Sequence, residues 1–245
     1  LMELWVMIDA ARRASAGRIT AVVPYYAYGR TDKKDQPRVA ITARLVADFI
    51  TAAGADRVLT MNLHAGQIQG FFNIPLDELD AIDLLAQRFR ERGLKDLAVA
   101  ATDIGAAKKA RDMADRLDAP IAIIEKQRLG NSDEVAAVNL IGNVEGKTTL
   151  IVDDEINTGA SVVAAAQALK DHGAAEVYCC VVHPVLSGKA PEALANSVLK
   201  ELFATIEERQ GPLSDGQTRS AEVGLDMRYV GQEHKLREAG IEVRE

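Results

Sequence analysis

The stretch LIVDDEINTGASVV, residues 150–163, decides the fold class of this 245-residue chain. Its aliphatic first half is typical of a buried strand, and the two aspartates Asp153 and Asp154 follow directly. Asn157, Thr158 and Gly159 then turn the chain into a run with helical composition. In open α/β sheets, ligands bind outside the carboxyl ends of parallel strands. We therefore expect the two carboxylates to lie at a binding site.

The same alternation of strand and helix patterns occupies most of the chain. Short β-branched runs begin at residues 18, 56, 96, 120, 148 and 176, and Ala- and Leu-rich helical patterns lie between them. The helical patterns at 39–54 and 161–174 end at or near glycines, Gly54 and Gly173, which suit helix ends. The alternation predicts an α/β protein with mostly parallel sheets.

Two segments of the chain repeat one pattern. GADRVLTMNLH (54–64) and GAAEVYCCVVH (173–183) both read Gly, Ala, two residues, Val, five residues and His. Because each follows a predicted strand, loop and helix, we take duplication of one domain as the working hypothesis. The division falls near residues 72–81, which predicts one domain over 1–75, a second over 76–205 and an atypical polar tail over 206–245.

Composition narrows the class of partner. A net charge of -7 and 4% aromatic residues argue against a nucleic-acid surface and favour a small anionic ligand. The sequence contains neither eighteen consecutive apolar residues nor a leader with a cleavage site, so we expect a cytoplasmic chain that does not enter a membrane. Cys179 and Cys180 are adjacent in a predicted strand, which predicts core thiols and no disulfide framework.

The segment NTGAS, residues 157–161, has the composition of a phosphate cradle. It supplies small and hydroxyl side chains, a glycine that allows close backbone approach, and free N–H groups at a helix start. Asp153 and Asp154 could meanwhile accept hydrogen bonds from sugar hydroxyls. The alternative is an ordinary acidic cap between a strand and a helix.

Further polar segments follow other predicted strands. RTDKKDQPR (30–38) suits a polyphosphate, with a solvated charge run as the alternative. His64 is either a metal ligand or a structural histidine. Asp103 either caps a helix or holds a cation through water. Lys126 and Arg128 precede LGNSDE (129–134), which has the composition of a mobile loop, so both could simply be solvated.

Together these motifs resemble ribose-phosphate diphosphokinases. The resemblance rests on IVDDEINTGAS (151–161), YGRTDKKDQPR (28–38), NLHAGQIQGFF (62–72), ATDIGAAKKA (101–110) and IIEKQR (123–128), and covers residues 1 to about 203. The first motif alone is also similar to the phosphoribosyl-pyrophosphate loop of phosphoribosyltransferases. The resemblance implies two tandem phosphoribosyltransferase-like domains. We expect the first to be incomplete, because the family's N-terminal portion is absent before Leu1.

The resemblance also implies roles for individual residues, which we state as expectations. Lys126 and Arg128 would be catalytic, Arg30 and Thr31 would bind ATP, and His64 and Asp103 would be associated with Mg²⁺. The ribose 5-phosphate site would comprise Arg128, Asp153, Asp154, Asn157, Thr158, Gly159, Ala160 and Ser161. The chain departs from the family's common residues at Thr31, Asn62 and Asn157, where Gln, Asp and Asp are usual. His183, which matches His64 in the internal repeat, is expected only to satisfy hydrogen bonds.

The implied reaction converts ribose 5-phosphate and ATP into phosphoribosyl diphosphate and AMP. The implied assembly is a homo-oligomer of dimers that form a hexamer. The alternative is a non-catalytic, nucleotide-binding partner subunit of the same enzyme, which the three substitutions and the atypical ends favour. A phosphoribosyltransferase that consumes the diphosphate ranks last, because it would explain neither RTDKKD nor the tandem halves.

Overall fold

The computed structural model describes residues 1–128 and 135–204, with the backbone alone at 126–128 and 135–138. The chain forms two compact units, of which unit 1 spans Leu1–Asp80 and unit 2 begins at Ala81. The sequence placed the division after residue 75, immediately before a short strand that belongs to unit 1, Leu76–Leu79. This strand was not predicted because its four residues, LDEL, include two acids and none of them is fully buried. The predicted tail from residue 206 lies outside the described residues.

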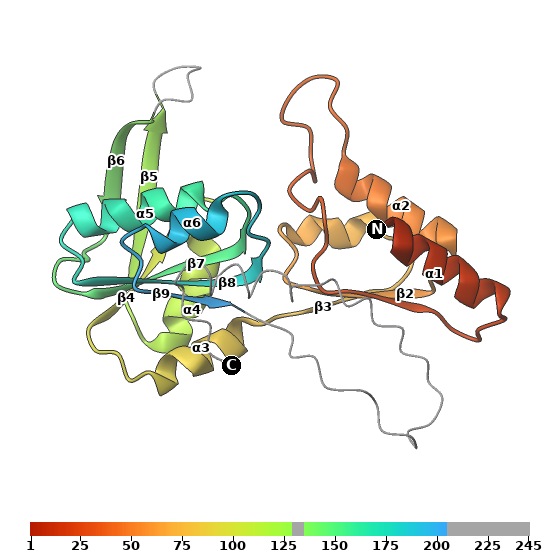
Figure 1. Cartoon of the computed structure of the whole chain (residues 1–245), viewed down its shortest axis with the longest axis horizontal. Coiled ribbons are helices and arrows are strands. Elements are labelled where there is room, and N and C mark those ends of the chain that lie inside the picture. Colours follow the sequence, from red (N-terminus) through yellow and green to blue (C-terminus); the bar gives the residue numbers. More distant parts are fainter. Residues whose placement is uncertain (129–134, 205–245) are drawn as a thin grey trace. The chain divides into compact units, whose positions relative to one another are not determined.

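Unit 1 contains a three-stranded parallel sheet in the order β1-β2-β3 (Figure 1). Its elements are α1 (Met2–Arg13), β1 (Thr20–Val23), α2 (Thr42–Ala53), β2 (Arg57–Met61), the 3-10 helix η1 (Gly66–Phe71) and β3 (Leu76–Leu79). Helix α2 buries Ala43, Val46, Ala47 and Ile50, a stripe with helical spacing. Gly54 ends the helix in the left-handed conformation, with φ +112°, as the sequence indicated.

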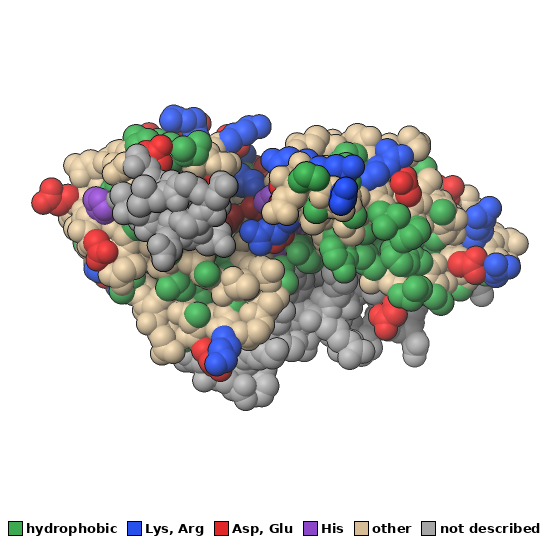
Figure 2. Space-filling view, turned by 90° about the horizontal axis from the view of Figure 1, so that it is seen from above, with side chains coloured by type: hydrophobic (Ala, Val, Ile, Leu, Met, Phe, Trp, Pro, Cys, Tyr) green, Lys and Arg blue, Asp and Glu red, His purple; other side chains and the backbone are tan. Residues whose placement is uncertain are grey.

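Unit 1 also exposes apolar side chains on its two long helices. Met2 and Val6 of α1 and Leu45 and Phe49 of α2 are all exposed, with Val6 retaining 61% of its accessible surface. Figure 2 shows hydrophobic side chains gathered on the face of this unit that is turned to the viewer. A face of this kind is typical of a surface that contacts another protein.

Unit 2 is built on a six-stranded sheet in the order β6-β5-β4-β7-β8-β9. Its strands are β4 (Leu97–Ala101), β5 (Ile121–Arg128), β6 (Val135–Ile141), β7 (Thr148–Ile156), β8 (Glu176–Pro184) and β9 (Glu201–Ala204). Its helices are α3 (Ile82–Glu91), α4 (Ala107–Leu117), α5 (Ala160–Asp171) and α6 (Ala190–Ala195). All the strand pairs are parallel except β5 with β6. Helices α3 and α4 cover one face and α5 and α6 the other (Figure 1).

The strand order of unit 2 creates a place for a ligand. From β4 the chain moves outward through α4 to β5, and it later returns to β7 on the other side of β4. The connections after β4 and β7 therefore leave the sheet in opposite directions. Ligands of open α/β sheets bind in the crevice at such a switch point, beyond the carboxyl ends of the two strands.

The predicted α/β class with mostly parallel sheets is confirmed. Strands β3, β6 and β9 were not predicted, and all three lie at sheet edges; the side chains of β3 and β9 are mostly only partly buried. Cys179 and Cys180 are fully buried free thiols of β8, and burial raises the pKa of both. No helix within the described residues is both long and apolar enough to cross a membrane.

Candidate active site

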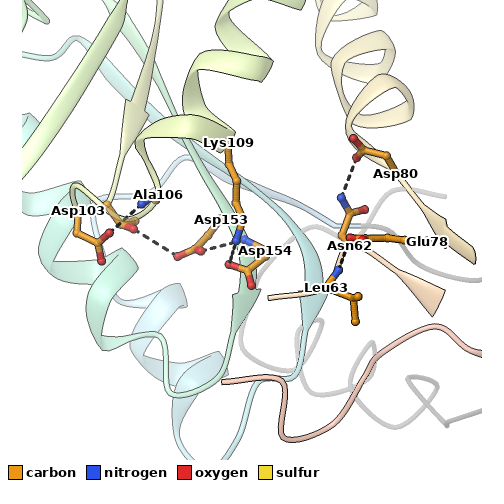
Figure 3. A network of polar contacts seen from close by, with 10 residues as sticks. Asn62, Leu63, Glu78, Asp80, Asp103, Ala106, Lys109, Asp153 and Asp154 are labelled. Carbon is orange, nitrogen blue, oxygen red and sulfur yellow. Dashed lines mark hydrogen bonds and ion pairs between the residues drawn. The ribbon is translucent and has the colours of Figure 1, made fainter. Parts of the chain in front are cut away.

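The acid pair of unit 2 lies near the carboxyl end of β7. Thr149 to Val152 are buried in the centre of the sheet, and the strand continues through the acids to Ile156. Asp154 is 5% exposed, and its Oδ1 lies 2.7 Å from the Nζ of Lys109 on α4 (Figure 3). Asp153 Oδ1 accepts the backbone N–H of Asp154 at 2.9 Å, and Asp153 Oδ2 lies 3.4 Å from the hydroxyl of Thr102. Both carboxylates are therefore held by neighbouring polar groups.

The proton affinity of Asp153 is unusual. Burial raises its pKa to about 7, and the neighbouring Asp154 acts in the same direction. The backbone N–H of Asp154 and the ammonium group of Lys109 oppose the rise. Asp153 therefore exchanges its proton near neutral pH, which makes the pair responsive to a ligand that brings hydroxyl donors or positive charge.

The turn after β7 is tightly constrained. Gly159 has φ +78° and directly precedes α5, whose start has no side-chain cap. A Cβ at Gly159 would lie 3.3 Å from Leu194 Cγ, so the position needs glycine for conformation and for space. Backbone N–H groups of Leu186 and Ser187 donate to the carbonyls of Ile156 and Asn157 at 2.9 and 2.8 Å. The turn is thus anchored by the chain after β8.

Only the first three of the five residues in the predicted phosphate cradle, 157–161, lie in a loop. The residues 157–159 form the turn, whereas Ala160 and Ser161 lie in the first turn of α5. Their N–H groups belong to the set that has no acceptor within a helix and that suits an anion. The side-chain Oδ1 of Asn157 is buried, and no described group donates a hydrogen bond to it. A buried acceptor of this kind is suited to a donor from a ligand.

Asp103 lies beyond the carboxyl end of β4, the strand that neighbours β7 in the sheet. Its Oδ1 accepts the backbone N–H of Ala106 at 3.0 Å, one residue before α4 begins (Figure 3). This contact lies in the turn before the helix, and α4 itself begins without a side-chain cap, so the capping interpretation stays a prediction. The residue is exposed, so its carboxylate also presents oxygen to solvent. Its role with a metal stays a prediction.

Lys126 and Arg128 are part of β5, which continues to Arg128 and does not end before it. Their backbones pair with Val138 and Val135 of β6, with an irregularity between Gln127 and Arg128. Since β5 is parallel to β4 and adjacent to it, the two residues lie toward the same edge of the sheet as Asp103. Their side chains and the predicted mobile loop, 129–134, lie outside the described residues.

Unit 1 brings together the other predicted residues. Arg30 and Thr31 are exposed in a turn after β1, where the N–H and hydroxyl of Thr31 donate to the carbonyl of Tyr28 at 2.9 and 2.8 Å. Gly29 of this turn is buried against His64, and an added Cβ would lie 3.3 Å from His64 Cβ. The segments predicted to bind ATP and a metal are therefore adjacent, at the carboxyl ends of the neighbouring parallel strands β1 and β2.

Two carboxylates at the end of β3 hold the segment that carries His64. Glu78 accepts the backbone N–H of Leu63 at 2.8 Å and the side-chain amide of Gln69 at 2.5 Å. Asp80 Oδ1 accepts Nδ2 of Asn62 at 2.7 Å (Figure 3). Asn62 has φ +39°, a conformation that asparagine tolerates well. Asn62 therefore acts as a hydrogen-bond donor here, a role that an ionised aspartate could not fill.

The two histidines of the internal repeat differ in environment. His64 lies in the turn after β2 and is partly exposed, whereas His183 is 5% exposed within β8, in register with Glu155 of β7. The expectation that His183 serves a structural role agrees with its burial. The roles of both residues toward ligands stay predictions.

Sequence reasoning did not single out Lys109, Glu78 or Asp80. Glu78 and Asp80 are two residues apart in ELD, so their spacing could have indicated one face of a strand. Lys109 follows the candidate Asp103 by six residues, but only the adjacency of β4 and β7 brings its helix to Asp154. That adjacency has no signal in the local sequence.

Comparison with known proteins identifies the family of this chain. Residues 1–54 match the model of the N-terminal domain of ribose phosphate pyrophosphokinase, and residues 69–212 match that of the phosphoribosyl transferase domain. The ribose-phosphate pyrophosphokinase of Halalkalibacterium halodurans is 51% identical over 217 residues, which are 88% of this chain and 68% of that protein. The chain belongs to the ribose-phosphate pyrophosphokinase family.

Two further proteins support this assignment to the family. The protein from Corynebacterium ammoniagenes is 52% identical over 206 residues, covering 84% of this chain and 64% of that protein. The crystal structure of phosphoribosylpyrophosphate synthetase from Mycobacterium smegmatis superposes with a TM-score of 0.77 and 41% identity, covering 83% of this chain and 66% of that one. The family and the phosphoribosyltransferase-like fold predicted from the motifs are confirmed. The chain spans about two thirds of the length of these relatives.

Proposed function

We propose that this chain transfers the diphosphoryl group of ATP to the 1-hydroxyl of ribose 5-phosphate, giving phosphoribosyl diphosphate and AMP. The observation that carries the proposal is the acid pair Asp153 and Asp154 at the carboxyl end of β7. The pair lies at the switch point of the sheet and directly precedes a glycine turn into a helix N-terminus. This arrangement suits a ligand with sugar hydroxyls at one end and a phosphate at the other. The names of the relatives support this choice of reaction.

The ribose 5-phosphate would be bound along β7 and the start of α5. The N–H groups of the first turn of α5 and the hydroxyls of Thr158 and Ser161 would hold the 5-phosphate. Asp153 and Asp154 would accept hydrogen bonds from the ribose hydroxyls. The buried Oδ1 of Asn157 fits a hydroxyl donor of the sugar better than a phosphate oxygen, because the amide oxygen and a phosphate oxygen are both acceptors.

ATP would be bound by the turn of Arg30 and Thr31, with the Arg30 guanidinium on phosphate oxygens. Mg²⁺ fits Asp103, since an exposed carboxylate offers the oxygen ligands that this ion prefers. His64, in unit 1, would contact Mg²⁺ directly or through its water shell. The bound ion would neutralise charge on the phosphate oxygens of ATP.

The transfer step would be an in-line attack of the ribose 1-hydroxyl on the β-phosphorus of ATP, with AMP as the leaving group. Lys126 would neutralise charge that develops on the transferred phosphates, and Arg128 would bind them with its planar guanidinium. Catalysis would therefore come from positioning and electrostatics, as in other phosphoryl transfers.

We also propose that several copies assemble, as dimers that form a hexamer. The exposed apolar side chains of α1 and α2 support assembly, because burying them between copies would remove them from water. Sedimentation at several protein concentrations tests this proposal, and a monomer throughout contradicts it.

The reaction is tested by AMP formation from ATP and Mg²⁺, with and without ribose 5-phosphate. We expect AMP only when the sugar phosphate is present, and a loss of about a hundredfold in Lys126→Ala, because a contact made in the transition state is removed. Lys95→Ala, an exposed lysine of the same unit, is the matched control. ATP binding without AMP formation in any of these proteins would support a non-catalytic partner subunit and contradict the enzyme.

A further inference from the structure

Lys109 forms an ion pair whose two ends differ in exposure. Its Nζ lies 2.7 Å from Asp154 Oδ1, and 34% of the lysine side chain is exposed against 6% of the aspartate side chain. Lys109 is the third residue of α4, and its exposed neighbour Lys108 provides an internal comparison. A lysine that is two thirds covered has less freedom than a solvated one, so the contact constrains both partners.

A nearly buried carboxylate needs a partner for its charge. Removing an ionised carboxylate from water is costly unless a cation or several hydrogen-bond donors replace the water. The cost is greater here because Asp153 is the adjacent residue, and two neighbouring carboxylates cannot both ionise freely. The ammonium group of Lys109 lowers this cost directly at Asp154.

Other elements of unit 2 also face the pair. Thr102, directly after β4, presents its neutral hydroxyl to Asp153, and β8 contributes the thiols of Cys179 and Cys180. Both thiols stay neutral at physiological pH, because burial raises their pKa. Helix α4 contributes Lys109. Lys109 is therefore the cation that the described contacts of unit 2 place on the acid pair.

We propose that Lys109 is a positioning residue of the ribose 5-phosphate site, which holds Asp154 ionised and oriented to accept hydrogen bonds from ribose hydroxyls. This inference rests on the proposed function and deepens it. With a neutral side chain at position 109, Asp154 would share a proton with Asp153 and lose the contact that fixes its Oδ1. A protonated or rotated carboxyl group accepts hydrogen bonds from hydroxyls less well.

The first readout needs no ligand. The carboxyl carbons of Asp153 and Asp154 are titrated by ¹³C NMR between pH 4 and 9 in the wild-type chain, Lys109→Met, Lys109→Arg and the control Lys108→Met. We expect Lys109→Met to raise the upper titration midpoint of the pair by at least about one pH unit, because an opposite charge in contact is lost. Lys109→Arg and Lys108→Met should titrate like the wild-type chain. An unchanged titration in a folded Lys109→Met overturns the inference.

The second readout is the affinity for ribose 5-phosphate, measured by calorimetry at pH 7.5. We expect Lys109→Met to bind at least tenfold more weakly, and Lys109→Arg and Lys108→Met to stay within about threefold of the wild-type chain. Equal affinity of Lys109→Met and the wild-type chain overturns this inference alone. If the wild-type chain binds no ribose 5-phosphate, the proposed function is contradicted. The role of Lys109 in binding ribose is then overturned as well. Circular dichroism spectra establish that each variant is folded.

Discussion

Replacing Asp153 by asparagine should stabilise unit 2, and the gain should be clearly larger at alkaline pH than at pH 5. The structure explains why the amide is tolerated. The side-chain oxygen of asparagine can still accept the N–H of Asp154, as Asp153 Oδ1 does at 2.9 Å. Its amide nitrogen can donate toward the carboxylate of Asp154 or the hydroxyl of Thr102.

The sign follows from the raised pKa of Asp153. The ordinary pKa of 3.8 applies in the unfolded chain, whereas burial raises the pKa in the folded chain to about 7. Folding therefore takes up a proton between these two values. The stability linked to this group is fully present below about pH 4 and is lost as the pH rises through about 7. Asparagine, which cannot ionise, avoids that loss.

The magnitude has an upper limit set by the same two pKa values. A rise from 3.8 to about 7 corresponds to about 4 kcal/mol for an isolated group, at roughly 1.4 kcal/mol per pKa unit. Because Asp153 and Asp154 titrate together, the substitution recovers only part of this free energy. We expect a gain of about 1–3 kcal/mol in the free energy of unfolding at pH 8.5.

Urea denaturation at pH 5, 7 and 8.5 measures this gain by circular dichroism. Fluorescence of Trp5, the single tryptophan, reports on unit 1 and should be unaffected. Asp115→Asn, on the exposed side of α4, is the matched control and should change stability by less than about 0.5 kcal/mol. The reasoning is refuted if Asp153→Asn has the same effect at pH 5 and pH 8.5, or if it destabilises the chain more at the higher pH.

Two further substitutions test the turns that carry the candidate site. Gly159→Ala should destabilise unit 2 by about 2–4 kcal/mol, because it combines a positive φ with close packing. Gly188→Ala, with a positive φ in open space, should cost about 1 kcal/mol in the same denaturation assay, and equal losses would contradict the packing argument. Glu78→Ala should speed hydrogen exchange at the N–H of Leu63 at least tenfold, because that N–H loses its acceptor. Glu3→Ala, in α1 of the same unit, should leave this exchange rate unchanged, and slow exchange in Glu78→Ala would show that the turn is held by other contacts.

Much of the candidate site was predictable because it follows from local pattern. A buried aliphatic run that ends in Asp153 and Asp154 and turns at Gly159 has one common structural meaning, a parallel strand leading into a helix. The carboxyl ends of parallel strands converge at one edge of a sheet, so the order of residues along the chain is enough to assign polar residues after strands to a site. Arg30, His64 and Asp103 follow strands in this way, and Asp154 lies among the last residues of β7.

The sequence by itself therefore determined the fold class, the family and the segments that carry the candidate site, since periodicity, glycine positions and motif order are local properties. The tertiary structure alone decided which side chains meet. The contact of Lys109 with Asp154 exists because β4 and β7 are neighbours although 46 residues separate Ala101 from Thr148 in the chain. Glu78 likewise meets Leu63 because β3 pairs with β2. Strand order is set by the burial of whole faces of the sheet, and no single segment encodes it.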